Sequence, residues 1–414
     1  MIADQQGQES GYDLILINGK VLTPFRVIPH GGVAIKGKAI ERVFAMEELP
    51  AWEATRTIDV GGRVIAPGFI DLHLHGGGGA DIMDDDREAV LKIAALHVRG
   101  GATAIVPSTM TSALPDLYRA LDNVRYAKEK QAKHGYAGAK ILGAHLEGPY
   151  FSAAQNGAQD ARHLKHPVRE EYERILDYSP DIIRVSAAPE LEGALALGRE
   201  LNQRGILASI GHTDATYDEV LRALEAGYRH VTHLYSGTSG VRRVNAYRVA
   251  GVIESALLLE ALTVEIIADG SHLPASLIKL VYKCKGPEGI ALITDALRAA
   301  GMPEGEYILG GAADGQRVIV EDGVAKLPDR SAFAGSVATM NVLVRNAVEL
   351  GGIPLEAAVG MAASTPARII GCDRTKGSLS AGKDADIVVF TEREIAVKMT
   401  IVEGQVVHDE MDRS

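Results

Sequence analysis

The chain has 414 residues and a formal net charge of −11, which argues against nucleic acid or an anionic membrane surface as its main partner. Its hydrophobic share of 46% and charged share of 23% are ordinary for a globular protein, and the length allows one large domain plus a small one. The sequence has no apolar signal core, no run near the roughly 20 apolar residues of a membrane-spanning helix, and no cysteine framework. We therefore expect a cytoplasmic protein in which any anionic substrate needs a local basic patch.

Short β-type segments occupy both ends of the chain. Residues 13–59 contain three stretches rich in β-branched residues, with hairpin signals at Asn18-Gly19 and Lys36-Gly37. Residues 384–409 have the same pattern of β-branched runs, with Glu403-Gly404 as the turn. Both ends therefore predict small antiparallel sheet.

The middle of the chain alternates between β-type and helical segments. A helix is expected to begin at Asp86 and stop at Gly100-Gly101, and another to begin at Thr213 or Asp214 and end at Gly227. The eight β-type runs are residues 69–75, 102–107, 140–147, 182–189, 206–212, 230–234, 264–269 and 290–295.

This alternation predicts an α/β fold with a (β/α)8 TIM-type barrel over residues 67–376, because helical crossovers are right-handed and lie outside the strands. Residues 1–66 and 377–414 would together form a small β-sandwich domain into which the barrel is inserted. An open, doubly wound sheet is the alternative, although no G-x-G-x-x-G fingerprint follows an early strand.

The first predicted barrel strand carries paired histidines. Asp71, His73 and His75 alternate with apolar residues, so they lie on one face of the strand. Two imidazoles two residues apart point the same way, as two ligands of one metal ion must. The glycines at 76–79 let the backbone run close to whatever lies at the strand end. Two histidines hydrogen-bonded in a core are the alternative for an isolated H-x-H.

Six of the eight predicted strands end in residues that bind metals or move protons, and in a barrel these ends meet at one face. Such a set of histidines and carboxylates suits one or two divalent ions such as zinc, with iron, cobalt or manganese as alternatives. Separate structural roles for each residue are the competing interpretation, and six coincidences at one face count against it. The residues are His73, His75, His145, Glu147, His212, His233, Asp269, His272 and Asp295.

A metal ion would lower the pKa of a bound water from 15.7 to about 7, and proton transfer then needs a carboxylate nearby. Asp295 is the best placed, alone at the end of the last strand. His272 is spaced from the apparent ligands and would polarise a carbonyl or stabilise an oxyanion.

These motifs resemble the amidohydrolase superfamily and, within it, the N-acetylglucosamine-6-phosphate deacetylase family. PGFIDLHLHG resembles the superfamily's opening motif, and KGSLSAGKDADIVVF at residues 376–390 its closing one. GAHLEGPY, GHTDATYDE, THLY, IADGSH, LITDAL and FAGSVATM are more specific, and the match runs over essentially the whole chain. The resemblance implies a metal-dependent deacetylase that hydrolyses the N-acetyl group of an amino-sugar phosphate, in the first place N-acetylglucosamine 6-phosphate.

The resemblance also implies roles for single residues. Glu147, His212 and His233 would bind the principal metal ion, and His73 and His75 would hold a second ion with Glu147 and Asp295. Asp295 would be the catalytic acid and base that takes a proton from water and delivers it to the leaving amine. His272 would contact the acetamide carbonyl, and His145 is interpreted as a supporting or core residue. The implied substrate-binding residues are Ala158, Gln159, Ser236, Gly237, Arg242, Arg243, Asp269, Gly270, His272, Ala334 and Gly335.

Departures from the family pattern fall at the phosphate end. Ser236-Gly237 stands where the family typically has Asn-Ala. Arg242, Arg243 and Arg248 supply three guanidiniums that either bind phosphate or form a solvated or interface patch. In the family an arginine of this segment reaches across a dimer interface, which implies a homodimer.

These departures leave alternatives for the substrate open. They are N-acetylgalactosamine 6-phosphate, an unphosphorylated N-acyl amino sugar and a cyclic amide. A non-catalytic relative that uses the barrel for assembly or ligand binding is a remote alternative, because no predicted ligand is missing.

Overall fold

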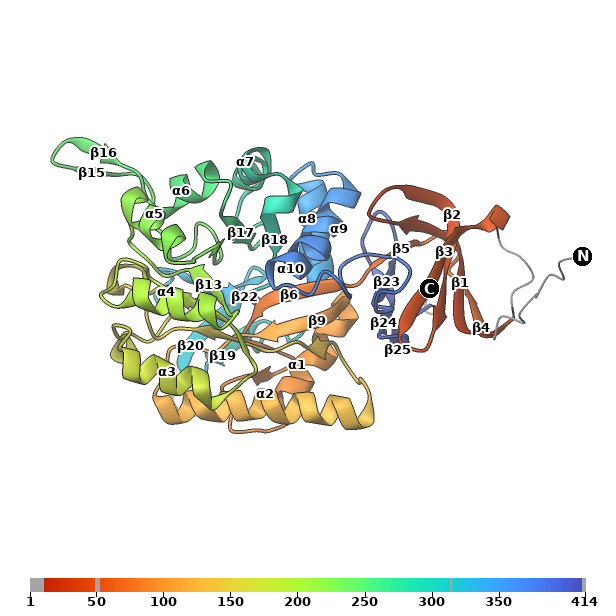
Figure 1. Cartoon of the computed structure of the whole chain (residues 1–414), viewed down its shortest axis with the longest axis horizontal. Helices are drawn as coiled ribbons and strands as arrows, with labels where there is room; N and C mark the ends of the chain where they lie inside the picture. Colours follow the sequence, from red (N-terminus) through yellow and green to blue (C-terminus); the bar gives the residue numbers. More distant parts are fainter. Residues whose placement is uncertain (1–10, 49–52, 313–314, 412–414) are drawn as a thin grey trace, which may run out of the picture.

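One eight-stranded sheet takes its strands from both ends of the chain (Figure 1). The structure, a computed structural model, describes residues 11–48, 53–312 and 315–411. The strands follow the order β25-β24-β23-β5-β1-β2-β3, with β4 paired to β1, and the two ends of the chain join where β5 pairs with β23. The strands are β1 (Tyr12–Leu22), β2 (Val27–Lys36), β3 (Ala39–Ala45), β4 (Ala54–Asp59), β5 (Val64–Pro67), β23 (Ile387–Phe390), β24 (Val397–Val402) and β25 (Gln405–Asp409).

Two expectations for this sheet are wrong. The sheet is mixed rather than antiparallel, because β4 and β5 both run parallel to β1. Asn18-Gly19 is not a hairpin turn: β1 continues through it, the register with β2 shifts there, and Asn18 has φ 60°. An Asn-Gly pair suits any backbone with positive φ, and here it serves a bulge. The turns at Gly37 and at Glu403-Gly404 are confirmed.

The middle of the chain supplies parallel strands in two sheets, β10-β9-β6 and β11-β12-β13-β14-β17-β18. Isolated parallel bridges link the two sheets, Leu74 to Ala296 and Ser108 to His145. Each of the eight expected runs overlaps at least one of these strands, and the third run divides into β10 and β11. The strands are β6 (Phe69–Leu74), β9 (Ala102–Pro107), β10 (Lys140–Ile141), β11 (Ala144–Glu147), β12 (Ile182–Ala187), β13 (Leu207–Ile210), β14 (His230–Val231), β17 (Thr263–Ile266) and β18 (Ile290–Leu292).

The α-helices of the described residues lie around these strands (Figure 1). Their bounds are α1 (Ala89–His97), α2 (Leu114–His134), α3 (Arg169–Tyr178), α4 (Ala194–Gln203), α5 (Tyr217–Glu225), α6 (Val252–Leu258), α7 (Ala275–Lys285), α8 (Met340–Glu349), α9 (Leu355–Ala362) and α10 (Ser364–Ile369). Five 3-10 turns are also described, at Met46–Glu48, Val98–Gly100, Ala153–Gln155, Ala161–His163 and Pro287–Gly289.

The expected ends of α1 and α5 are correct, but their expected starts are too early. Asp86 lies before α1 and accepts a hydrogen bond from the backbone N–H of Glu88. The cap of α5 is Thr216, whose backbone N–H donates to the Glu219 carboxylate at 2.8 Å. Thr213 instead donates its hydroxyl proton to Glu190, so it belongs to the loop after β13.

Three further β elements leave the parallel strands. A short pair, β7 (Gly76–Gly77) and β8 (Ala80–Asp81), follows β6. A hairpin of β15 (Arg242–Val244) and β16 (Tyr247–Val249) projects from the body of the molecule (Figure 1). The third is an antiparallel sheet of β19 (Gly305–Leu309), β20 (Gln316–Glu321), β21 (Val324–Lys326) and β22 (Phe333–Ser336).

The ionisable face of β6 is buried along its whole length. Every residue of β6 is buried, so Asp71 and His73 need partners inside the protein. Asp71 accepts a hydrogen bond from the Thr294 hydroxyl at 2.5 Å, and burial raises the pKa of Asp71 to about 7.

Among the described residues, no helix combines the length and the apolar character needed to cross a membrane. The expected cytoplasmic location stays a prediction.

His97, the last residue of α1, packs against the glycine-rich turn after β6. Its Nε2 donates to the carbonyl oxygen of Gly76 at 3.0 Å, and its Nδ1 has no hydrogen-bond partner among the described residues. Burial lowers the pKa of His97 to about 4. The imidazole is therefore neutral in the folded protein at pH values where it is charged in the unfolded chain.

We expect this histidine to make stability fall as the pH falls. Between the two pKa values the unfolded chain binds a proton that the folded protein does not, so the unfolded state gains from acid. Between about pH 7.5 and about pH 5 the wild type should lose about 2 kcal/mol more stability than His97→Gln, which keeps a donor toward Gly76. Urea unfolding at both pH values measures the difference, and equal losses in the two proteins would contradict the prediction.

Candidate metal centre and active site

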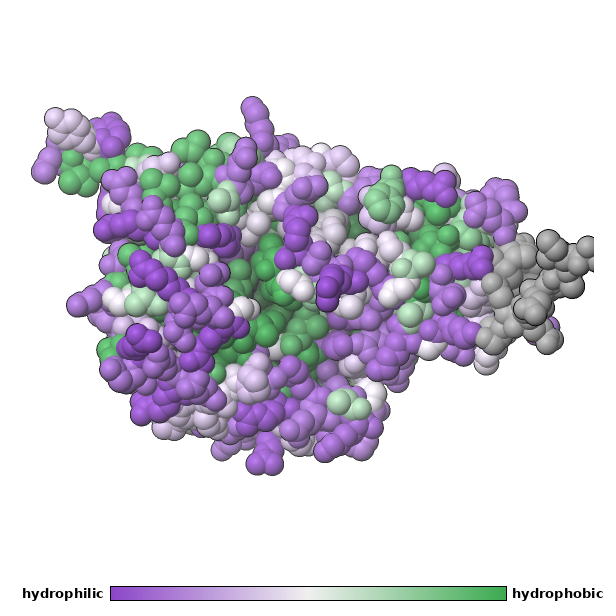
Figure 2. Space-filling model, viewed as in Figure 1, coloured by the Kyte–Doolittle hydropathy of each residue, from purple (hydrophilic) through white to green (hydrophobic). Residues whose placement is uncertain are grey.

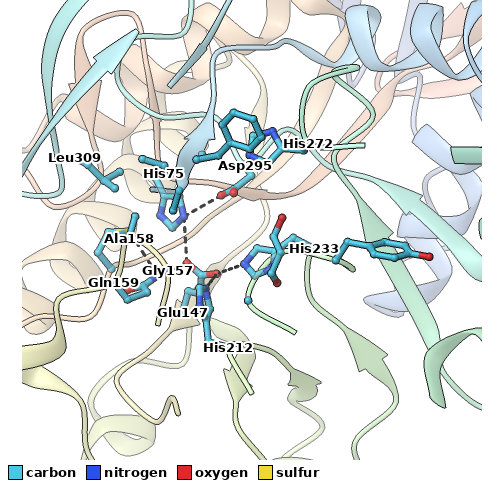
Figure 3. A pocket seen from close by; sticks show the side chains of 18 residues that line it. His75, Glu147, Gly157, Ala158, Gln159, His212, His233, His272, Asp295 and Leu309 are labelled. Carbon is cyan, nitrogen blue, oxygen red and sulfur yellow. Dashed lines mark hydrogen bonds and ion pairs between the residues drawn. The ribbon is translucent and has the colours of Figure 1, made fainter. Parts of the chain in front are cut away.

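Glu147, the last residue of β11, lies at the centre of a buried cluster of histidines (Figure 3). Its Oε1 is 2.9 Å from Nε2 of His233 and 3.3 Å from Nε2 of His212. The same oxygen is 3.3 Å from Nε2 of His73, and Oε2 is 3.2 Å from Nε2 of His75. These residues lie at the carboxyl ends of β11, β14, β13 and β6 or shortly beyond them, so the ends of four parallel strands build the cluster.

Asp295 completes the cluster from the chain after β18. Its Oδ1 is 3.2 Å from Nε2 of His75 and 3.5 Å from Nε2 of His73. Two groups of three side chains therefore present ligand atoms within 4.8 Å of one another. One is His73, Glu147 and His233, the other is His73, His75 and Asp295, and His73 belongs to both.

In each histidine the Nδ1 atom has an acceptor outside the cluster, and this contact orients the Nε2 atom toward the cluster. All four Nδ1 atoms lie near an acceptor oxygen, which leaves each Nε2 to face Glu147. Three acceptors are backbone carbonyls and the fourth is a carboxylate. The pairs are His75 with Ser108 O at 2.9 Å, His212 with Gln155 O at 2.9 Å, His233 with Ser236 O at 3.0 Å, and His73 with Glu265 Oε2 at 3.4 Å.

Opposite charges shift the pKa values inside the cluster. Burial alone would lower the pKa of His73, but the carboxylates of Glu147 and Asp295 outweigh it and raise that pKa to about 9. Burial alone would raise the pKa of Glu147, but the charge of His73 and the hydrogen bonds of His212 and His233 hold it well below its usual range. Protons and a metal ion therefore compete for the same Nε2 atoms.

The donor set fits a divalent metal ion. His73 Nε2 is buried and has no hydrogen-bond partner of good geometry among the described residues, although Glu147 Oε1 is 3.3 Å away. A buried imidazole nitrogen left without a partner is costly, and a metal ion would satisfy it together with its neighbours. Nitrogen and carboxylate oxygen ligands suit zinc, iron, cobalt and manganese.

A cavity of about 240 Å³ opens beside this cluster (Figure 3). His272 lies at the cavity wall, where its Nδ1 is 2.7 Å from Asp269 Oδ2 and its ring packs against Phe333 with centroids 4.8 Å apart. The predicted site residues that line the cavity are His75, Glu147, Ala158, Gln159, His212, His233, Ser236, Gly237, His272, Asp295, Ala334 and Gly335.

The remaining predicted site residues lie elsewhere. His73 is fully buried and does not line the cavity. Asp269 does not line the cavity either, but it contacts His272, which does. Gly270 lies outside the cavity wall. Arg242 forms an ion pair with Asp214, and Arg243 is exposed on the projecting hairpin.

His145 supports the cluster instead of facing it. Its Nδ1 is 2.8 Å from Ser108 Oγ and its Nε2 is 2.8 Å from Ser186 Oγ, so both nitrogens are occupied. Its ring meets that of His73 edge-on, with centroids 4.7 Å apart. The interpretation of His145 as a supporting residue agrees with these contacts.

Sequence reasoning missed a buried ion pair below the cluster. Glu265 on β17 and Arg184 on β12 are fully buried, and Arg184 donates to both Glu265 oxygens. A charged residue in the middle of an apolar β run was the available signal, because such residues are almost never fully buried unless paired. The cavity residues that were missed are Met110, Gly157, Tyr235, Leu309, Ala332 and Phe333.

Comparison with known proteins agrees with the motifs. The Amidohydrolase family matches residues 64–407. The chain is 35% identical to an N-acetylglucosamine-6-phosphate deacetylase of Vibrio furnissii over 368 residues, 89% of this chain and 88% of the relative. It is 34% identical to an N-acetylgalactosamine-6-phosphate deacetylase of Escherichia coli O157:H7, over 88% of this chain and 92% of the relative.

Solved structures agree at the level of the fold. A variant of N-acetyl-D-glucosamine-6-phosphate deacetylase from Mycobacterium smegmatis, in complex with N-acetyl-D-glucosamine-6-phosphate, superposes with a TM-score of 0.85. It is 32% identical, and the match covers 96% of this chain and all of the other (100%). The deacetylase from Pasteurella multocida has a TM-score of 0.86 at 28% identity, covering 95% of this chain and 99% of that one. The chain therefore belongs to the amidohydrolase family and, within it, to the N-acetylglucosamine-6-phosphate deacetylases.

Proposed function

We propose that the protein hydrolyses the N-acetyl group of N-acetylglucosamine 6-phosphate and releases glucosamine 6-phosphate and acetate, a step of amino-sugar catabolism. The observation that carries this proposal is the convergence of four imidazoles on the Glu147 carboxylate, with the Asp295 carboxylate at the cavity wall beside them. The deacetylase relatives over most of the chain support the same reaction.

We infer that the site holds a divalent metal ion, with zinc in the first place and iron, cobalt or manganese as alternatives. Glu147, His212 and His233 would hold the principal ion. His73 and His75, with Glu147 and Asp295, would hold a second ion. The short distances between the imidazole nitrogens and the Glu147 oxygens support both sets.

When bound, the metal ion supplies Lewis acidity toward water and the amide carbonyl. Asp295 lies at the cavity wall and would accept the proton of the attacking water. As the water oxygen bonds to the carbonyl carbon and the C–N bond breaks, Asp295 would return that proton to the leaving amine. His272, fixed by Asp269, would stabilise the oxygen of the acetyl group.

The cavity wall suggests where the sugar lies. Ala158, Gln159, Ser236, Gly237, Ala334 and Gly335 line it and would contact the sugar phosphate. Gln159 also donates to Glu147 Oε2 at 2.8 Å, so it would link the sugar side of the cavity to the metal cluster. N-acetylgalactosamine 6-phosphate is a second candidate, because one relative at 34% identity is a deacetylase of that sugar and Ser236-Gly237 departs from the expected Asn-Ala.

We also propose a homodimer in which the projecting hairpin serves the partner's site. Among the described residues, no arginine or lysine lines the cavity that would receive the phosphate. Arg243 and Arg248 face each other in register on the hairpin and are exposed. Figure 2 shows hydrophobic surface on the hairpin and over α6, and the exposed hydrophobic residues of these segments include Val241, Val244 and Leu258. Such apolar exposure suits a protein interface.

We also propose a closed barrel and a small β-sandwich domain. The bridges from Leu74 to Ala296 and from Ser108 to His145 support closure of the parallel strands into a (β/α)8 barrel over residues 67–376. The eight-stranded sheet supports a small β-sandwich domain formed by residues 1–66 and 377–414, of which residues 11–48, 53–66 and 377–411 are described.

Acetate release from a panel of N-acetyl amino sugars tests the function. We expect the zinc-loaded protein to act fastest on N-acetylglucosamine 6-phosphate and slowly on the sugar without phosphate. Faster turnover of N-acetylgalactosamine 6-phosphate would favour the second candidate. Absence of acetate release from every sugar would contradict a deacetylase.

Asp295→Asn should lose turnover by roughly 10²–10⁴-fold, because an amide cannot take the proton that a positioned general base accepts. The variant should keep the ion held by Glu147, which elemental analysis measures beside the rate. Full activity of Asp295→Asn would rule out its role in proton transfer.

Glu147→Gln provides the matched contrast to that variant. The same change of carboxylate to amide at the centre of the histidine cluster should release the metal ion and, with it, activity. Metal content equal to that of the wild type would contradict the ligand role of Glu147.

Arg243→Ala combined with Arg248→Ala should raise KM for the phosphorylated sugar while the rate on the unphosphorylated sugar changes little. Removal of a guanidinium–phosphate contact costs binding and leaves the reacting groups in place. Arg229→Ala is the control, because Arg229 is an exposed arginine whose guanidinium donates to the backbone carbonyls of Leu224 and Tyr228 near α5. Equal losses on both sugars would contradict the phosphate role of the hairpin.

A further inference from the structure

His73 differs from the other three histidines of the cluster. Its Nδ1 lies 3.4 Å from a carboxylate oxygen, Glu265 Oε2, whereas the others face backbone carbonyls. It is also the one histidine that belongs to both groups of candidate metal ligands. Whatever holds His73 therefore acts on both of these groups.

Glu265 contacts a second ligand through the same oxygen. Oε2 accepts a hydrogen bond from the backbone N–H of His233 at 3.3 Å, in addition to its contact with His73. His73 and His233 both belong to the group that includes Glu147. One buried carboxylate thus touches two of the three residues in that group from the side opposite the cavity.

Arg184 holds this carboxylate in place. Its Nη2 donates to Glu265 Oε2 at 2.9 Å, and its Nη1 donates to Oε1. The other three N–H groups donate to Ser209 Oγ at 3.0 Å, Thr232 Oγ1 at 3.0 Å and the carbonyl oxygen of Leu72 at 3.2 Å. All five donors of the guanidinium are used, and the Leu72 contact fixes the backbone directly before His73.

The buried ion pair of Arg184 and Glu265 is poorly explained by a contribution to folding stability alone. Both charges are fully buried, and a buried ion pair is commonly no more stabilising than apolar residues of similar volume. A carboxylate behind a metal-binding imidazole, in contrast, fixes its tautomer and ring orientation and increases its basicity. The guanidinium neutralises that carboxylate, so the charge can remain buried beneath the cluster.

We propose that Glu265, held by Arg184, is a positioning residue that sets the metal affinity of the site through His73 and His233. The inference rests on the proposed metal centre and extends it to a pair of residues that do not face the cavity. Loss of the carboxylate would leave His73 with a weaker acceptor, and loss of the guanidinium would leave the carboxylate unpaired.

Zinc affinity of the full chain in Glu265→Gln tests the proposal. The change keeps a neutral oxygen acceptor for His73, as the other histidines have, and removes the charge together with the second acceptor oxygen, to which Arg184 Nη1 donates. We expect the zinc dissociation constant, measured by competition with a chromogenic chelator, to rise about 10–100-fold. Asp386→Asn is the matched control, because Asp386 is also a buried carboxylate paired to a cation, Lys376, and it directly precedes β23 of the eight-stranded sheet. Its zinc affinity should equal that of the wild type.

A second variant tests the same proposal if Glu265→Gln does not fold. Arg184→Met combined with Glu265→Met removes both charges together and leaves no unpaired ion in the core. It should fold and show the same weakening of zinc binding. Unchanged zinc affinity in either folded variant, while the wild type binds zinc, would overturn this inference alone. A wild type that binds no zinc would overturn both this inference and the proposed metal centre.

Discussion

The contact between the Glu147 carboxylate and the imidazoles around it is the interaction on which the site depends. A carboxylate that is almost fully buried costs several kcal/mol unless opposite charge and hydrogen bonds compensate it. Here the compensation comes from His73, His212 and His233, which are far apart in the chain. The fold must therefore bring the ends of separate strands within hydrogen-bond distance, which parallel strands with a common direction do.

The backbone has positive φ angles at three residues that follow these strands. His212, His233 and Asp295 have φ values of 47°, 26° and 48°, in the left-handed region that side chains with a Cβ seldom adopt. Each such residue costs about 1–3 kcal/mol and persists only where the surroundings determine it. Beyond the strands, His212 and His233 contact Glu147, and Asp295 contacts His75 and His73. Strain at three strand ends is thus part of how the cluster is assembled.

The alternation of residues predicted much of this arrangement, since period 2 places His73 and His75 on one face, and the structure has a strand there. The strand that ends at Glu147 was predictable from its β-type run, whereas β18 ends at Leu292, before Asp295. Local signals failed where more than one backbone geometry satisfies them: Asn18-Gly19 serves a bulge, and Thr213 bonds Glu190 instead of starting α5.

Contacts between distant segments were beyond sequence reasoning. Arg184 and Glu265 are each a charged residue in an apolar run, 81 positions apart, but their pairing with each other appears only when β12 and β17 contribute to one interior. The placement of Phe333 against His272 depends likewise on the β19–β22 sheet returning to the cavity. Arg242 was predicted to bind substrate from its charge, whereas its ion pair with Asp214 depends on tertiary structure.

An anomalous difference map from zinc-loaded crystals, measured at the zinc absorption edge, tests the central claim most directly. We expect a peak inside the histidine cluster with Glu147 oxygen and His233 nitrogen at about 2.0–2.2 Å from it. A map without a peak in the cluster, in which Glu147 keeps its direct hydrogen bond to His233, would show that the cluster is not a metal site.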